Sequence, residues 1–212
     1  MPDRTVLQAF ELLQNEDSIS ISTEAYSLIK QYAIFLRRWN DSLSLVSAGD
    51  LPLIETAHLV DALSLAPYVK KFCADGGSIL DIGSGGGFPI IPLKCLFPDI
   101  PCTLVERSTR KVGFLHRVVT HLNFSNTEII HGAFPDVIDK ITASIITARA
   151  VERPEKIVSG ILSRLPKNGA FLCQFAAGRW TIPKTFHVEH IDDSWTHAGL
   201  RRGNFSIITR QQ

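Results

Sequence analysis

The sequence predicts an α/β fold, in which a seven-stranded, mostly parallel sheet follows an N-terminal helical extension. Within residues 1–72, apolar residues recur every three or four positions, as in amphipathic helices. From residue 78 onward, short apolar runs of strand type alternate with helical stretches. This alternation is typical of a parallel sheet that carries helices on both faces. We therefore expect an extension over residues 1–72 and one α/β domain over residues 73–212.

The extension is expected to hold one long amphipathic helix of about 16 residues, from Ala25 to Trp39. Gly49 and Asp50 interrupt the helical pattern, which then resumes and ends before Pro67.

The apolar runs that follow predict the order of the strands and helices in the α/β domain. Strands are expected at residues 78–82, 102–106, 127–131, 143–148, 169–175, 185–191 and 204–210. Helices are expected at residues 87–97, 109–122 and 154–164. No helix is evident between the last two strands, so these strands are expected to form an antiparallel hairpin.

The composition indicates an ordinary globular protein. The net charge is +1, and hydrophobic residues make up 45% of the chain. The four cysteines show neither a C-x-x-C pattern nor the spacing of a zinc site, so no metal and no disulfide framework is expected. No apolar run reaches the roughly 18 residues of a membrane helix, and no signal-peptide core is evident. We expect a cytoplasmic protein, acting as a monomer.

The most informative segment is a glycine-rich turn that follows the first predicted strand. Gly83, Gly85 and Gly87 alternate with other residues, and Asp81 stands two positions before the first of them. Glycines bring bare backbone against a ligand, because no Cβ blocks the approach. Glu106 ends the next predicted strand about 20 positions later, where a carboxylate suits the two hydroxyls of a ribose.

Two kinds of cofactor suit such a turn. A dinucleotide fingerprint, G-x-G-x-x-G, needs its third glycine at position 88, where this chain has Phe88. The pattern Asp-x-Gly-x-Gly-x-Gly is instead the turn of enzymes that bind S-adenosylmethionine. We therefore expect S-adenosylmethionine as the cofactor, with an NAD-linked oxidoreductase as the least favoured alternative. In such sheets the ligand lies beyond the carboxyl ends of the strands, where the strand order reverses.

Five motifs together resemble the glucose-inhibited division protein B family, whose members are ribosomal RNA small-subunit guanine-N7 methyltransferases. The resemblance runs from about Tyr32 to Trp180. Its motifs are Arg38-Trp39-Asn40, His58-Leu59-Val60-Asp61, residues 81–89, Glu106 with Arg110-Lys111 and Phe114-Leu115, and Thr147-Ala148-Arg149-Ala150. The resemblance implies a Rossmann-like class I methyltransferase fold, S-adenosylmethionine as cofactor, and a guanine of 16S ribosomal RNA as substrate. It also implies cofactor contacts at Gly83, Phe88, Phe134, Pro135 and Arg149.

Three residues are candidates for a role in the transfer itself. Guanine N7 carries a lone pair and no proton, so the enzyme must position the base rather than deprotonate it. Arg149 ends a predicted strand, where it could donate to guanine or phosphate or close over the cofactor; the alternative is a surface pair with Glu152. His58 and Asp61 share a helical face. They either line the entrance or form a hydrogen-bonded pair that fixes the extension to the sheet.

Four positions depart from the family pattern: Ala57, Ala62, Ile90 and Ala177. The family has a cation at two of these, where this chain has Ala57 and Ala177. These two departures motivate an alternative function, a cofactor-retaining RNA-binding protein with weak or no transferase activity.

A basic segment follows the second predicted strand. Arg107, Arg110, Lys111 and Arg117 occur there without an intervening acid. We expect these side chains to contact RNA phosphates, with Lys111 and Arg117 pointing away from the strand ends, although a solvated helix face would show the same pattern. Arg110 lies closest to Glu106 and could pair with it instead.

Overall fold

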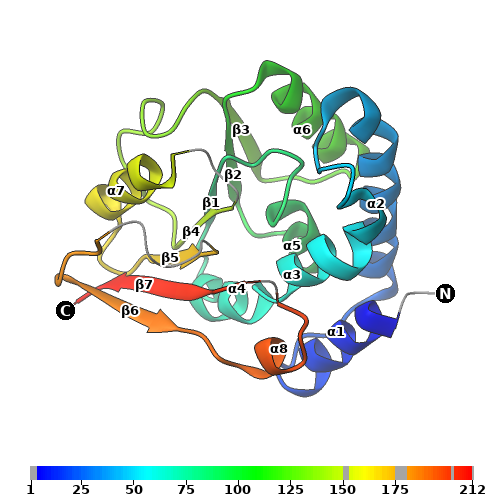
Figure 1. Cartoon of the computed structure of the whole chain (residues 1–212), viewed down its shortest axis with the longest axis horizontal. Helices are drawn as coiled ribbons and strands as arrows, with labels where there is room; N and C mark the ends of the chain where they lie inside the picture. The colour runs from blue at the N-terminus through cyan, green and yellow to red at the C-terminus, as the bar shows by residue number, and fades with distance from the viewer. Residues whose placement is uncertain (1–3, 150–152, 175–180, 202, 212) are drawn as a thin grey trace.

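The computed structural model describes residues 4–149, 153–174, 181–201 and 203–211, and it contains one seven-stranded sheet with helices on both faces (Figure 1). The strand order is β3-β2-β1-β4-β5-β7-β6. The strands are β1 (Ile79–Ile82), β2 (Cys102–Glu106), β3 (Thr127–His131), β4 (Ile145–Ala148), β5 (Ala170–Cys173), β6 (Phe186–His190) and β7 (Ser206–Arg210). Strands β1 to β5 pair in parallel, whereas β7 is antiparallel to both β5 and β6. The predicted fold class and the terminal antiparallel pair are confirmed.

The central strand β1 separates two hydrophobic cores. Ile79 belongs to the core that holds α2 (Thr23–Leu43), α5 (Ile90–Leu96) and α6 (Thr109–His121). Leu80 and Ile82 belong to the core under α7 (Pro154–Arg164). All four residues of β1 are buried, as expected for a strand with helices on both faces.

The helical extension is more broken than its periodicity predicts. Helix α2 is a single long helix, capped by the Ser22 side chain, which accepts from the Ala25 amide. The helical pattern between Asp50 and Pro67, however, does not form one continuous helix. The chain there forms short segments instead: η1 (Leu51–Leu53, 3₁₀), η2 (Ile54–Leu59, π), α3 (Val60–Leu63) and α4 (Ala66–Cys73). Pro67 lies in the first turn of α4, where its missing amide costs nothing, so it begins a helix rather than ending one.

Other boundaries differ by a few residues. The helix predicted to begin at residue 87 begins at Ile90, because the glycine turn occupies the positions before it. A four-residue helix, α8 (Ser194–His197), lies between the last two strands, where no helix was expected. Asp193 caps it by accepting from the Thr196 amide at 3.2 Å. The last residue of the strand predicted at residues 169–175 lies outside the described part of the chain. Ala177 and Glu152 also lie outside it.

The extension and the sheet share one core. Leu36 of α2 and Leu13 of α1 (Arg4–Asn15) belong to the same buried cluster as Ile79 of β1. The division at residue 72 therefore stays a prediction. Among the described residues, no helix combines the length and apolar character of a membrane span.

Two cations that sequence alone would assign to the surface are buried in the framework. Lys94 is 1% exposed and its Nζ donates to the carbonyls of Ile100 and Ser125 at 2.9 and 3.0 Å. Arg201 is 7% exposed and donates to the Ser64 carbonyl and to Asp193. Both side chains donate to oxygens of other segments, which offsets the cost of burying their charge.

Trp195 forms a further link between distant parts of the chain. Its indole is 1% exposed, and its Nε1 donates to Asp17 at 3.2 Å. Asp17 lies in the connection between α1 and α2. The short helix α8 is thus hydrogen-bonded directly to the connection between the two N-terminal helices.

Candidate functional site

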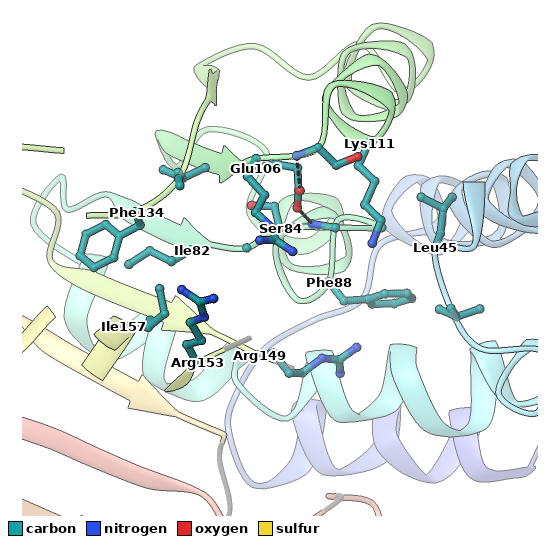
Figure 2. Close-up of a pocket in the computed structure, with 18 of the residues that line it drawn as sticks. Leu45, Ile82, Ser84, Phe88, Glu106, Lys111, Phe134, Arg149, Arg153 and Ile157 are labelled. Carbon is teal, nitrogen blue, oxygen red and sulfur yellow. Dashed lines mark hydrogen bonds between the residues drawn. The ribbon is translucent and has the colours of Figure 1, made fainter. Parts of the chain in front are cut away.

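A cavity of about 720 Å³ opens at the carboxyl ends of β1, β2 and β4. This is where the strand order reverses, between β1 and β4, and it is the place where ligands bind in open parallel sheets. Figure 2 shows Glu106 and Ser84 at the middle of the cavity, with Phe134, Ile82 and Ile157 on one side and Phe88 and Leu45 on the other. The volume is within the range of small-molecule sites.

The glycine turn owes its shape to backbone conformations that favour glycine. Gly83, Gly85 and Gly87 have φ values of 76°, 53° and 96°. A Cβ at Gly85 would meet only the Gly83 carbonyl, at 3.7 Å, so the backbone here faces open space in the cavity. The turn therefore presents bare backbone to the cavity.

Gly87 is more constrained than Gly85. A Cβ there would lie 2.5 Å from Ile91 Cγ1, in addition to the strain of a positive φ. We expect Gly87→Ala to lower the free energy of unfolding by about 2 kcal/mol, because the left-handed conformation alone costs a non-glycine residue about 1–2 kcal/mol. Gly85→Ala, whose methyl group meets no close neighbour, should lower the free energy of unfolding only by the strain of its positive φ. Urea denaturation of both variants tests this, and equal losses would contradict it.

Glu106 fixes the turn from the end of β2. Its Oε2 accepts from the Gly85 amide at 2.9 Å, and its Oε1 accepts from the Ser108 amide at 2.7 Å (Figure 2). The side chain lines the cavity although the residue is only 6% exposed. Each carboxylate oxygen has two acceptor positions, so Glu106 keeps capacity for two hydroxyl groups of a ligand. Arg110 does not pair with Glu106 as considered above; it donates to the Ser42 carbonyl.

Asp81 lies beneath the turn and does not line the cavity. It is 1% exposed; its Oδ1 accepts from Thr147 Oγ1 at 2.6 Å, and its Oδ2 has no hydrogen-bond partner among the described residues. Burial raises the pKa of Asp81 to about 6 from its usual 3.8, although hydrogen bonds from Ser84 and Thr147 act in the opposite direction. The negative charge of Asp81 is therefore costly unless a cation comes close.

This raised pKa has a consequence for stability. The folded protein holds the Asp81 proton more tightly than the unfolded chain, so the contribution of Asp81 to the free energy of unfolding falls as the pH rises from 3.8 to about 6. We expect the stability difference between the unaltered protein and Asp81→Asn to fall across this window and to level off above it. Urea denaturation at a series of pH values measures this, and a pH-independent difference would contradict it.

Arg149 lies at the centre of a row of polar side chains that ties the extension to the sheet. Its Nη1 donates to Asp61 Oδ2 at 2.8 Å, and its Nη2 lies 3.0 Å from His58 Nδ1. Asp61 also accepts from Gln174 Nε2, at 3.2 Å. On the other side of its ring, His58 Nε2 lies 3.6 Å from Asp50 Oδ1. The row places Arg149 on the cofactor side of the sheet and fixes its direction.

Phe88 forms the face against which this row lies. The guanidinium carbon of Arg149 is 5.2 Å from the Phe88 ring centroid, and the His58 ring is 5.4 Å from it. Tyr32 packs edge-on against Phe88 and donates to the Gly86 carbonyl at 2.7 Å. Phe88 therefore has a fixed orientation at the cavity wall.

The structure brings most of the predicted site residues to one cavity. Those that line it are His58, Gly83, Gly85, Phe88, Glu106, Phe134 and Arg149. Asp61, Asp81, Gly87 and Pro135 do not line it. Asp61 acts behind Arg149, whereas Pro135 and Phe134 pack closely against Gly160 of α7.

The basic segment differs from its expectation in one respect. Lys111 lines the cavity and, in Figure 2, extends from α6 toward it, so the expectation that it points away from the strand ends is wrong. Arg117, in contrast, lies over the Trp39 ring at 5.0 Å from its centroid and donates to the Gly113 carbonyl.

Several lining residues were missed at the sequence level. Leu45, Val46, Ser47 and Asp50 follow α2 without any periodic pattern, and only the Gly49-Asp50 break marks this segment as a loop. Further missed lining residues are Ser84, Arg153, Lys156 and Ile157. Arg153 has a positive φ of 53° at the start of α7, which no sequence signal indicates.

The sheet order, the glycine turn and the carboxylate at the end of β2 define a class I methyltransferase fold. Two solved structures of low sequence identity share it. The S-adenosylhomocysteine-bound methyltransferase PaMTH1 of Podospora anserina has a TM-score of 0.64 at 12% identity, over 100% of this chain and 98% of that one. The protein MtNAS in complex with S-adenosylmethionine has a TM-score of 0.61 at 13% identity, over 98% of this chain and 84% of that one.

Sequence relatives then identify the family. Residues 25–177 match the GidB family, described as rRNA small subunit methyltransferase G. The Ribosomal RNA small subunit methyltransferase G of Neisseria meningitidis serogroup C is 32% identical over 72% of this chain and 71% of that protein. The protein of the same name from Streptococcus agalactiae serotype III is 31% identical over 80% of this chain and 73% of that protein. The chain belongs to the rRNA small subunit methyltransferase G family.

Proposed function

We propose that the protein transfers a methyl group from S-adenosylmethionine to N7 of a guanine in 16S ribosomal RNA. The observation that carries the proposal is the Glu106 carboxylate, which faces the cavity at the end of β2 while it fixes the Gly85 turn. Two acceptor oxygens beside bare backbone suit a ribose with vicinal hydroxyls. Family membership supports ribosomal RNA as the acceptor.

The residues of the cavity fit the parts of the cofactor. Glu106 would accept from the ribose hydroxyls, and Gly83 and Gly85 would contact the cofactor through their backbone. Phe134, Ile82 and Ile157 form the apolar side, which suits an adenine (Figure 2). Asp81, Gly87 and Pro135 support these positions from behind. The buried negative charge of Asp81 also favours a ligand that carries a positive charge, as the amino group and the sulfonium do.

When bound, the cofactor supplies an electrophilic methyl group; the protein's own task is to position the acceptor and exclude water. Phe88 lines the cavity, and Arg149 lies over its ring as a donor to guanine or phosphate. Asp61 and His58 orient Arg149 through its two terminal nitrogens and are positioning residues in this scheme. No group of the protein needs to remove a proton from N7.

The cavity mouth suits an acceptor that carries phosphates. Arg107, Lys111, Arg153 and Lys156 all line it, whereas Asp50 and Glu106 are the only carboxylates among its described lining residues. Such an excess of cations attracts a polyanion and positions its backbone. Ala57, which motivated the binding-only alternative, is 4% exposed and is not one of these lining residues, so it lends that alternative no support.

Transfer of a labelled methyl group tests the proposal. Small ribosomal subunits from a methylation-deficient strain should incorporate label at one guanine, with the methyl on N7. Calorimetry with S-adenosylhomocysteine should show binding near ~1 µM, or about 8 kcal/mol. Binding without incorporation would favour the alternative RNA-binding function, and no binding at millimolar ligand would exclude the cofactor. The proposal includes a cytoplasmic location; the monomeric state stays a prediction.

A further inference from the structure

The acceptor side of the cavity holds a carboxylate, Asp50, that is not needed for cofactor binding or for the orientation of Arg149 in the proposed function. Of the two lining carboxylates among the described residues, Glu106 is held by the Gly85 and Ser108 amides at the cofactor turn. The other is Asp50, whose side chain is 35% exposed. Asp50 belongs to the segment from Leu45 to Asp50, which forms the cavity wall on the Phe88 side (Figure 2).

Local contacts hold Asp50 in place. Its Oδ2 accepts from Ser47 Oγ at 2.7 Å, and its own backbone amide donates to the same hydroxyl at 3.1 Å. His58 Nδ1 faces a donor, Arg149, so the His58 proton lies on Nε2, which points toward Asp50 Oδ1 at 3.6 Å. The carboxylate is therefore the outer end of the row that begins at Asp61, and each of its two oxygens has two acceptor positions.

Guanine has a pattern that such a carboxylate can read. Its Watson–Crick edge carries two adjacent donors, N1–H and the 2-amino group, whereas adenine has an acceptor at N1. Unpaired bases in RNA are commonly stacked on aromatic side chains and hydrogen-bonded on this edge. A guanine whose N7 faces the methyl donor turns the Watson–Crick edge away from the glycine turn. Phe88 and Arg149 already occupy the region between that turn and the extension.

We propose that Asp50 is a specificity residue, which accepts hydrogen bonds from N1–H and the 2-amino group of the target guanine. This inference rests on the proposed function and adds to it the reason why guanine, and not adenine, is the acceptor. A basic side chain could not replace Asp50 in this role, because both groups that it recognises are donors. The segment that follows α2 thereby supplies base recognition, while the sheet supplies the cofactor site.

The test compares two bases that differ in one group. The guanine methylated by the unaltered protein is first located, and RNA is prepared with inosine, which lacks the 2-amino group, at that position. Single-turnover transfer by the unaltered protein should be about 10- to 100-fold slower on inosine, since hydrogen bonds to charged groups have this effect. Asp50→Asn should slow transfer to guanine by a similar factor, and its preference for guanine over inosine should be smaller than that of the unaltered protein, because only one acceptor oxygen remains.

Two controls separate recognition from damage to the fold. Asp41→Asn removes an exposed carboxylate on α2 that does not line the cavity, and it should keep the unaltered preference. Affinity for S-adenosylhomocysteine should be the same in all three proteins. If Asp50→Asn keeps the unaltered guanine-to-inosine ratio, whatever its overall rate, Asp50 does not read the base. If the unaltered protein methylates no RNA, the proposed function itself fails, and the assignment of Asp50 falls with it.

Discussion

Replacing Glu106 with alanine is expected to weaken binding of S-adenosylhomocysteine by about 2–3 kcal/mol, or roughly 30- to 150-fold. The loss has two sources. The variant lacks the charged acceptor for the ribose hydroxyls, and it also releases the Gly85 and Ser108 amides that now donate to the carboxylate. Isothermal calorimetry at constant pH measures the effect directly.

A matched substitution separates these two sources. Glu106→Gln keeps one oxygen acceptor of the same length, so it should preserve part of the turn geometry and lose less affinity than Glu106→Ala. Urea denaturation should give both variants a free energy of unfolding within about 1 kcal/mol of that of the unaltered protein, because one side of Glu106 faces the cavity. Unchanged affinity in Glu106→Ala would remove the observation that carries the proposed function.

Replacing Asp61 with alanine is expected to have the largest effect on stability. The Asp61 and Arg149 side chains are 5% and 18% exposed, so the variant leaves a largely buried guanidinium without its carboxylate. Breaking such a pair costs about 3–5 kcal/mol, and the partial exposure of Arg149 places the expected loss near the lower value, about 3 kcal/mol. Urea denaturation measures this loss.

The double variant shows whether the loss belongs to the pair. Removing both charges with Asp61→Ala and Arg149→Met should be less destabilising than Asp61→Ala alone, since no unpaired charge stays behind. Methyl transfer should nevertheless be strongly reduced in both proteins, because each lacks a correctly directed Arg149. A double variant that is less stable than Asp61→Ala would show that Arg149 stabilises the fold without Asp61.

Local patterns predicted the sheet well because each strand is a short apolar run with its own boundaries. Residues 102–106 and 127–131 were predicted to the residue, since glycine, proline or polar turns flank them. The structure of the segment from Leu51 to Leu63 was not predicted correctly, because a helical spacing of apolar residues does not distinguish an α-helix from successive 3₁₀, π and α turns. There, packing against α1 and α5 overrides local propensity.

The glycine turn and Glu106 were predictable because both depend on short sequence spacing. The partners of Arg149 were not, since Asp61 lies 88 positions away in the chain and the resemblance assigned no contact between the two. Lys94 and Arg201 illustrate the same point, because charged residues are assigned to the surface unless their partners are known. Asp50 could have been found only as an acid in a loop break, a signal that many surface residues share.

The bond between Trp195 and Asp17 joins residues 178 positions apart, so it bears on how the protein matures during synthesis. The N-terminal helices leave the ribosome before their anchors, since Trp195 follows Asp17 by 178 positions and Arg201 follows Ser64 by 137. Chains fold progressively as they emerge, so the nascent chain should form the sheet around β1 to β5 before its N-terminal helices are fully secured. The helices that precede the wall from Leu45 to Asp50 therefore gain their last anchors only after all five parallel strands have been made.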